Sequence, residues 1–346
     1  PEYFIHGTAE DLADSPHRFF RAGAMIYANG RNPYLTTWRD VAQLNVFHHG
    51  LRAAAIETLL DIATQCDGLR CDMAMLTTTD VFQRTWGERA GEPPVQEYWR
   101  EVLSAVREQY PTHCFIAEVY WDLEWELQQQ GFDYCYDKPL YDRLVYESAE
   151  SVRGHLGAES AYQDRLIRFI ENHSEQRAAD TFWAGRALAA AVAAYTLPGA
   201  KLFHQGQLEG YTVRLPVFLT RRPEQAADRA LRAFYRRLTN AIQSPALRHG
   251  QWRLCAMSGW PDNTSYNNLA AWCWQAGEER RLIVVNLSNH TSQARVQLPW
   301  PELAGQTWVL EDIMEERVFE HSGDEILNMG LYVELAPWGR HFFAVR

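Results

Sequence analysis

Short hydrophobic runs that end in polar residues recur along the first two thirds of the chain. The first run ends at Arg70 and Asp72, the second at Glu118, and the third at Asn172 and His173. Each run is followed by a stretch with helical periodicity, and short continuous apolar runs are typical of buried parallel strands. The pattern therefore predicts alternating strands and helices that carry polar groups at the carboxyl ends of the strands.

Five such strands are predicted, at residues 69–71, 114–118, 132–136, 165–171 and 201–204. Helices are predicted around them, at 51–66, 95–109, 122–130, 139–162, 180–196 and 224–244. A parallel α/β barrel closes with eight strands. We therefore expect an α/β fold in which this chain carries strands four to eight of a (β/α)8 TIM barrel, with the first three strands upstream of Pro1.

Two further regions have different patterns. Residues 1–48 are rich in Pro, Gly, Asn and aromatic residues, which predicts a long excursion loop after the third barrel strand. Beyond residue 249, alternating segments separated by turn residues predict an antiparallel β-sandwich, with strands at 268–275, 280–286, 292–298, 307–312, 332–335 and 339–345. The predicted organisation is an excursion region (1–48), the second part of a barrel (49–248) and a β-sandwich domain (249–346).

Charge and composition narrow the possible partners. The net charge is −11 without a Lys/Arg-rich block, which disfavours nucleic acid and anionic membranes as partners. No apolar run approaches the roughly 20 residues of a membrane span, and six cysteines without a C-x-x-C pair favour buried free thiols and a cytoplasmic location. The 13 Trp, 16 Tyr and 15 Phe residues fit either stacking on sugar rings or a large core.

Two carboxylates on neighbouring strand ends match the requirement of glycoside cleavage. A retaining glycosidase needs two carboxyl groups about 5–5.5 Å apart, one ionised to attack the sugar and one protonated to serve the leaving oxygen. Arg70 lies two residues before Asp72 and so on the same face of its strand, where its charge favours the ionised form. A more apolar surrounding is expected for the acid, Glu118. An ordinary salt bridge is the alternative explanation for Arg70 and Asp72.

The motifs resemble those of the α-amylase superfamily, glycoside hydrolase family thirteen. The resemblance rests on three segments in the family's order: Gly68-Leu-Arg-Cys-Asp72, Phe115-Ile-Ala-Glu-Val119 and Phe169-Ile-Glu-Asn-His-Ser-Glu175. The segment Asp40-Val-Ala-Gln-Leu-Asn45 before a helix and the terminal sandwich are similar to the family's as well.

The resemblance implies a role for each matched residue. Asp72 would be the nucleophile, Glu118 the general acid/base and Arg70 the residue that orients Asp72, while Asn172 and His173 would contact the sugar in the donor subsite. Aromatic and loop residues near strand ends are weaker candidates for substrate contact, with core packing or a solvated loop as the alternative: Tyr120, Trp121, Trp86, Trp183, His204 and Glu209.

Ser174 is the main departure from the family pattern, because the family's third carboxylate belongs at this position. A neutral, shorter side chain there predicts a rate lower by a few orders of magnitude, as for the loss of one preorganised electrostatic group. Glu175 is expected to point elsewhere. A further departure is the apolar stretch Met73–Leu76, where typical α-amylases carry a Lys-His pair.

The predicted function is therefore a retaining α-glycosidase that hydrolyses or transfers α-glucosidic bonds of α-glucans or maltooligosaccharides. The alternative is an inactive homologue that binds α-glucan or serves as a subunit, which Ser174 and the absent first motif favour. A barrel enzyme of other chemistry is disfavoured, since no phosphate-binding Gly loop or strand-end Schiff-base lysine is evident. No metal-ligand spacing stands out and no cofactor is required; a calcium site of the family type remains open, as does the oligomeric state.

Overall fold

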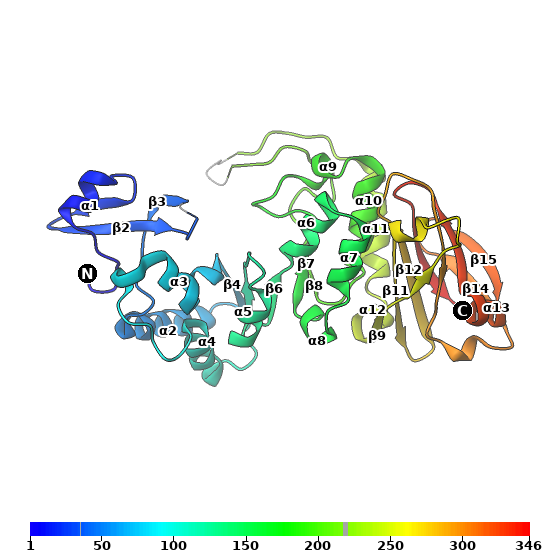
Figure 1. The fold of residues 1–346 in the computed structure, drawn as a ribbon, viewed down its shortest axis with the longest axis horizontal. Helices are drawn as coiled ribbons and strands as arrows, with labels where there is room; N and C mark the ends of the chain where they lie inside the picture. Colours follow the sequence, from blue (N-terminus) through cyan, green and yellow to red (C-terminus); the bar gives the residue numbers. More distant parts are fainter. Residues whose placement is uncertain (35, 217–220) are drawn as a thin grey trace. The chain divides into compact units, whose positions relative to one another are not determined.

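The computed structural model describes residues 1–34, 36–216 and 221–346. The chain forms two compact units, Pro1–Tyr136 and Asp137–Arg346 (Figure 1). Parallel strands alternate with helices through the first unit and into the second, and the second unit ends in antiparallel sheets.

The first unit begins with a small antiparallel sheet. Helix α1 (Ala9–Asp14) precedes strands β1 (Phe19–Ala22), β2 (Met25–Arg31) and β3 (Thr37–Ala42), which pair in that order. Phe19 and Ile26 of this sheet share a hydrophobic cluster with Phe82 and Trp86. The expectation of a loop without regular structure over residues 1–48 is therefore wrong. Strand β2 gave no period-two signal because its last buried residues are consecutive.

Three parallel strands and their helices complete the first unit. Strands β4 (Gly68–Cys71), β5 (Cys114–Ala117) and β6 (Tyr134–Tyr136) pair in parallel, as the sequence predicts. The α-helices around them are α2 (His49–Ala63), α3 (Thr79–Trp86), α4 (Tyr98–Gln109) and α5 (Glu124–Gln130), with short 3-10 turns at Ala74–Thr77 and Gly87–Ala90.

The second unit contains two further parallel strands, β7 (Leu166–Arg168) and β8 (Ala200–Lys201), the first of which follows three helices. Its helices are α6 (Lys138–Tyr146), α7 (Ala149–Leu156), α8 (Ser160–Gln163), α9 (Ala178–Thr181), α10 (Ala184–Tyr195), α11 (Arg229–Ala241) and α12 (Pro245–His249). Both strands are shorter than predicted, since only two residue pairs join them. Gly199, with φ of +87°, allows the close approach, because a Cβ there would lie 2.2 Å from the Leu166 carbonyl oxygen.

Two antiparallel sheets form the end of the chain. Six strands pair in the order β15-β14-β17-β12-β11-β9 and three in the order β10-β13-β16. Their bounds are β9 Gln251–Leu254, β10 Met257–Ser258, β11 Leu269–Ala276, β12 Glu279–Asn286, β13 Ser292–Val296, β14 Thr307–Asp312, β15 Arg317–Ser322, β16 Leu331–Leu335 and β17 Arg340–Val345, with helix α13 at Gly323–Met329 and 3-10 turns at Ser265–Asn268 and Pro301–Leu303.

The two sheets enclose one hydrophobic core. Leu282 and Val284 of the six-stranded sheet and Val296 and Val333 of the three-stranded sheet belong to the same buried cluster. Side chains on β13 and β16 alternate between buried and more exposed positions, which places one face of each strand against this core. All six segments predicted in this region are strands, while β9, β10 and β15 were not predicted.

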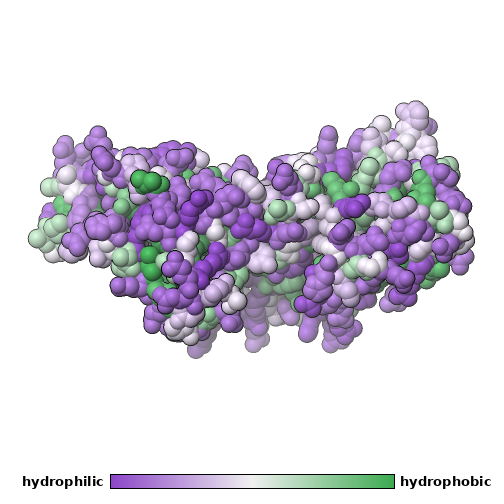
Figure 2. Space-filling model, turned by 90° about the horizontal axis from the view of Figure 1, so that it is seen from below, coloured by the Kyte–Doolittle hydropathy of each residue, from purple (hydrophilic) through white to green (hydrophobic). Residues whose placement is uncertain are grey.

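One face of the molecule is mainly polar. On the face that Figure 2 shows, hydrophilic residues cover most of the area and hydrophobic residues form small separate patches. Within the described residues, no helix is long and apolar enough to cross a membrane. The six cysteines are free, as expected, but Cys66 is exposed rather than buried because it lies beyond the end of α2.

Candidate active site

Asp72 and Glu118 follow two neighbouring parallel strands of the first unit. Strands β4 and β5 pair in register up to Cys71 and Ala117, the residues just before the two carboxylates. Backbone hydrogen bonds continue the ladder: the Glu118 N–H donates to the Cys71 carbonyl at 3.0 Å, and the Ala74 N–H donates to the Glu118 carbonyl at 2.9 Å. The backbone therefore holds the two residues next to each other.

Arg70 links the two carboxylates. Its Nη1 donates to Asp72 Oδ1 at 2.7 Å, and its Nη2 lies 2.8 Å from Glu118 Oε2. Burial lowers the pKa of Arg70, but the hydrogen bond to Asp72 and the charge of Glu118 raise it above its ordinary value overall. The Asp72 side chain is 74% exposed and that of Glu118 only 3%. One guanidinium thus orients an open carboxylate and a buried one by charge-assisted bonds.

Two further donors reach the Glu118 carboxylate. The Met73 N–H donates to Oε2 at 3.0 Å, and the Tyr120 hydroxyl donates to Oε1 at 2.9 Å. The expectation of an apolar surrounding for Glu118 is therefore wrong: this carboxylate is buried among hydrogen-bond donors. Tyr120 lies two residues after Glu118, in the segment that follows β5.

The backbone just after each carboxylate is strained. Met73, Trp121 and Asp122 have φ angles of 44°, 68° and 59°, in the left-handed region that non-glycine residues rarely adopt. The Trp121 ring packs edge-on against Tyr34, with 5.0 Å between centroids. Tyr34 was not predicted, because the contact joins residues that lie far apart in the chain.

In the second unit, Asn172, His173 and Ser174 follow strand β7. The Asn172 Oδ1 accepts the N–H groups of Ser174 at 2.8 Å and Glu175 at 2.9 Å, which closes a tight turn. The buried Nδ2 of Asn172 has no hydrogen-bond partner among the described residues. His173 is exposed and Ser174 half-buried. This turn therefore offers one unused donor beside two accessible side chains.

A buried charged cluster that was not predicted supports this turn. The Glu171 Oε1 lies 2.7 Å from Arg177 Nη1 and 3.0 Å from His204 Nδ1, and its Oε2 accepts the Ala178 N–H at 2.7 Å. The side chains of Glu171 and Arg177 are 1% and 4% exposed. The sequence shows Glu171 as a charged residue next to Asn172. The contact of Glu171 with His204 could not be predicted, because the two residues are distant in the chain.

The other predicted residues divide into core and surface. Trp86 is buried against Phe82 and stacks under Arg31, so it belongs to the core. Trp183 is 62% exposed. Glu209 lies in a loop, with its carboxylate 3.9 Å from the guanidinium of Arg232. In the described part of the chain, no three His, Cys, Asp or Glu side chains come together as a possible metal site.

Among known proteins, this chain is similar in sequence to an α-amylase. No family model matches the chain. A curated relative, the α-amylase MalA of Haloarcula japonica, is 27% identical over 230 residues, which cover 63% of this chain and 30% of the relative. This stretch of the chain is therefore similar in sequence to an α-amylase, in agreement with the resemblance of its motifs. It spans under a third of the length of this curated relative.

Solved structures of α-amylases share the fold. A maltogenic α-amylase from Thermotoga neapolitana superposes with a TM-score of 0.70 at 16% identity, over 97% of this chain and 73% of that one. An α-amylase from Geobacillus thermoleovorans, solved with acarbose, gives a TM-score of 0.65 at 16% identity, over 99% of this chain and 75% of that one. At such low identity these likenesses concern the fold.

The carboxylate next to Ser174, that of Glu175, contacts a lysine. The neighbouring Glu175 carboxylate lies 3.5 Å from Lys138 Nζ. Burial raises the pKa of Glu175, while the charge of Lys138 opposes that effect. The structure thus engages Glu175 with a lysine on α6, as expected for a residue that points elsewhere.

Proposed function

We propose that the protein is a retaining glycosidase of the α-amylase family that cleaves α-glucosidic bonds of α-glucans or maltooligosaccharides by hydrolysis or transfer. The five parallel strands would be strands four to eight of a (β/α)8 barrel, and the antiparallel sheets a C-terminal β-sandwich. The observation that carries the proposal is the bridge from Arg70 to both Asp72 and Glu118 at adjacent strand ends.

In the first step, Asp72 attacks the anomeric carbon and the bond to the leaving oxygen breaks. Glu118, in its protonated form, gives its proton to that oxygen. The exposure of Asp72 suits a group that must reach the sugar, whereas Glu118 is fixed by Tyr120 and the backbone. The products are a glycosyl ester on Asp72 and a free alcohol.

In the second step, water or an acceptor sugar replaces Asp72 at the anomeric carbon. Glu118, now a carboxylate, takes the proton of the attacking hydroxyl. The Asp72 ester carries no charge, so the Arg70 guanidinium then serves the charge of Glu118 alone. The full attraction of the guanidinium then stabilises the carboxylate of Glu118 in the second step, where that carboxylate acts as the base.

We assign sugar contacts of the donor subsite to Asn172 and His173 by resemblance to the family. The buried, unpartnered Nδ2 of Asn172 supports this assignment, because such a donor is costly unless a ligand or water accepts from it. Tyr120 and Trp121 are further candidate contacts. Ser174 is assigned to the position of the third carboxylate, and its neutrality is expected to lower the rate by about 10²–10³.

The second candidate function is an inactive homologue that binds α-glucan or acts as a subunit. Ser174 is the observation that favours it. The two functions differ in turnover: an enzyme with a weakened site still releases product above background, and a binding protein does not.

The test measures reducing-sugar and glucose release from maltotriose and maltoheptaose by the full-length protein. Three variants accompany it: Ser174→Asp, Asp72→Asn, and both changes together. We expect slow release by the unchanged protein, faster release by Ser174→Asp, and none by either variant with Asn at position 72. If all four proteins fold and none cleaves or transfers, the enzyme proposal fails and the binding function replaces it.

A further inference from the structure

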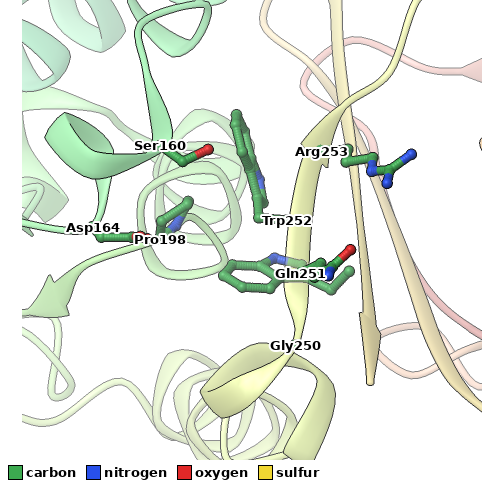
Figure 3. A pocket seen from close by; sticks show the side chains of 8 residues that line it. Ser160, Asp164, Pro198, Gly250, Gln251, Trp252 and Arg253 are labelled. Atoms are coloured by element: carbon green, nitrogen blue, oxygen red, sulfur yellow. The ribbon is translucent and has the colours of Figure 1, made fainter. Parts of the chain in front are cut away.

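A pocket of about 360 Å³ lies in the second unit, at the opposite ends of the strands from Asn172 (Figure 3). Its lining includes Ser160 and Asp164, which precede β7, and Pro198, which precedes β8. Asn172 and His204 follow these same parallel strands. The pocket is therefore separate from the candidate catalytic groups of this unit, and the proposed mechanism does not use it.

Two tryptophans form one wall of the pocket. Trp252 on β9 lies directly opposite Trp274 on β11, so both rings extend to the same face of the sheet. Trp274 is 5% exposed, and its indole N–H donates to the Thr196 carbonyl at 2.7 Å. Trp252 is half-buried on the edge strand of the sheet. The pair is therefore a rigid apolar surface with an accessible outer ring.

Polar groups that lack side-chain hydrogen bonds lie at these rings. The buried Nε1 of Trp252 has no hydrogen-bond partner in the part of the chain that the structure describes. Among the described residues, neither Ser160 nor Asp164 makes a side-chain hydrogen bond, and burial raises the pKa of Asp164 although the charges of Arg168 and Lys201 oppose that effect. In Figure 3 both residues lie on the same side of β9 as the Trp252 indole, whereas the Arg253 guanidinium points to the other side.

This combination matches a neutral sugar. An indole ring accommodates the C–H face of a pyranose, the Asp164 carboxylate accepts from sugar hydroxyls, and the Ser160 hydroxyl both donates and accepts. A volume of 360 Å³ falls within the usual range for small-molecule sites and suits one or two sugar rings. An anionic ligand is disfavoured, because a carboxylate faces the pocket and the guanidinium of Arg253 is turned away.

We propose that this pocket is an accessory site that binds one or two glucosyl units of an α-glucan. The choice of α-glucan rests on the proposed function, whereas the existence of a saccharide site rests on the pocket alone. Binding here would hold a long glucan on the protein without placing it at Asp72 and Glu118.

The experiment reads Trp252 directly. The full-length protein carrying Asp72→Asn, so that sugar is not consumed, is labelled with 5-fluorotryptophan. The fluorine resonance of Trp252 is identified by its disappearance in Trp252→Phe. We expect this resonance to shift on addition of maltotriose and to remain in place with cellotriose. A Trp252 resonance that stays fixed up to 20 mM maltotriose overturns the site, and equal shifts with both sugars overturn the α-glucan assignment.

Retention of the same proteins in native gels that contain glycogen gives an independent measure. Trp252→Ala should weaken the apparent affinity at least fivefold. Trp252→Phe, which keeps a ring but lacks the N–H, should weaken it less, and Arg253→Ala on the same strand should change it under twofold. Equal retention of all variants refutes the proposal. If retention depends on Trp252 while the protein with Asp72 intact and its Ser174→Asp variant release no product, the pocket is supported and the proposed catalytic function fails.

Discussion

Replacement of Arg70 by alanine tests the central feature of the candidate active site. The variant loses the guanidinium that contacts both carboxylates. Its bond to the buried Glu118 is charge-assisted and worth about 1.5–3 kcal/mol. The bond to Asp72 is largely exposed to solvent and contributes under about 1 kcal/mol. If both bonds act in the transition state, about 2–4 kcal/mol is lost, which corresponds to a decrease in kcat/KM of roughly 30- to 1000-fold.

The assay is kcat/KM for maltotriose, measured in the Ser174→Asp background if the unchanged protein is too slow. Arg70→Lys is the matched control. A lysine keeps the charge but presents a single point donor, so it should serve one carboxylate and recover about tenfold over alanine. Thermal unfolding of each variant separates lost catalysis from lost folding. A folded Arg70→Ala protein with kcat/KM within threefold of its parent would refute the role of Arg70.

Three further predictions concern stability. Asp137 is fully buried beside Arg168, so Asp137→Asn leaves an uncompensated guanidinium and should lower the free energy of unfolding by about 3–5 kcal/mol in urea titration. The pKa of Asp137 is about 2, because the charge of Arg168 outweighs the effect of burial, so its stabilising contribution is present above pH 4 and is lost as pH falls toward 2. The free energy of unfolding of the variant should therefore fall less steeply with pH in this acid range. Burial lowers the pKa of Lys201 to about 7, so the unfolded chain binds more protons than the folded chain between pH 7 and 10.5, and the contribution of this group to stability rises with pH there. Lys201→Met should abolish that rise. An unchanged slope of the free energy of unfolding against pH in the variant would contradict this prediction. Gly199→Ala forces a side chain against the Leu166 carbonyl at positive φ and should destabilise by at least about 1–3 kcal/mol, whereas a neutral effect would show that the backbone there can move.

The strands that position the site could be predicted because local signals agree with the fold. Short apolar runs flanked by helical periodicity identified all five parallel strands, and the polar residues at their ends made Asp72, Glu118 and Asn172 candidates for the site. The small sheet at the start of the chain and strand β15 gave no such signal. Strand β15 lies at a sheet edge with most residues exposed, so its hydrophobic pattern is weak.

Side-chain contacts between strands could not be predicted in the same way. The spacing of Arg70 and Asp72 predicts that they share a face, but the second bond of Arg70, to Glu118, depends on the register of β4 and β5. The same holds for Glu171 and His204, which lie 33 positions apart in the chain and meet within 3.0 Å. The positions of the strands can be predicted from a single sequence. The side-chain contacts between strands are harder to predict, because they depend on how the strands pack.

Backbone strain bears on whether Arg70 and Asp72 form an ordinary salt bridge or part of a site. Among the described residues, six non-glycine residues have positive φ, and three of them, Met73, Trp121 and Asp122, lie within four positions after Asp72 or Glu118. Such conformations cost about 1–3 kcal/mol each and persist where the surroundings enforce them. A salt bridge between residues two apart on one strand requires no such turns. At Met73 the turn directs an N–H onto Glu118, so the strained residue itself contributes a donor to the carboxylate assigned as acid/base. The strain therefore favours a preorganised site over a structural ion pair.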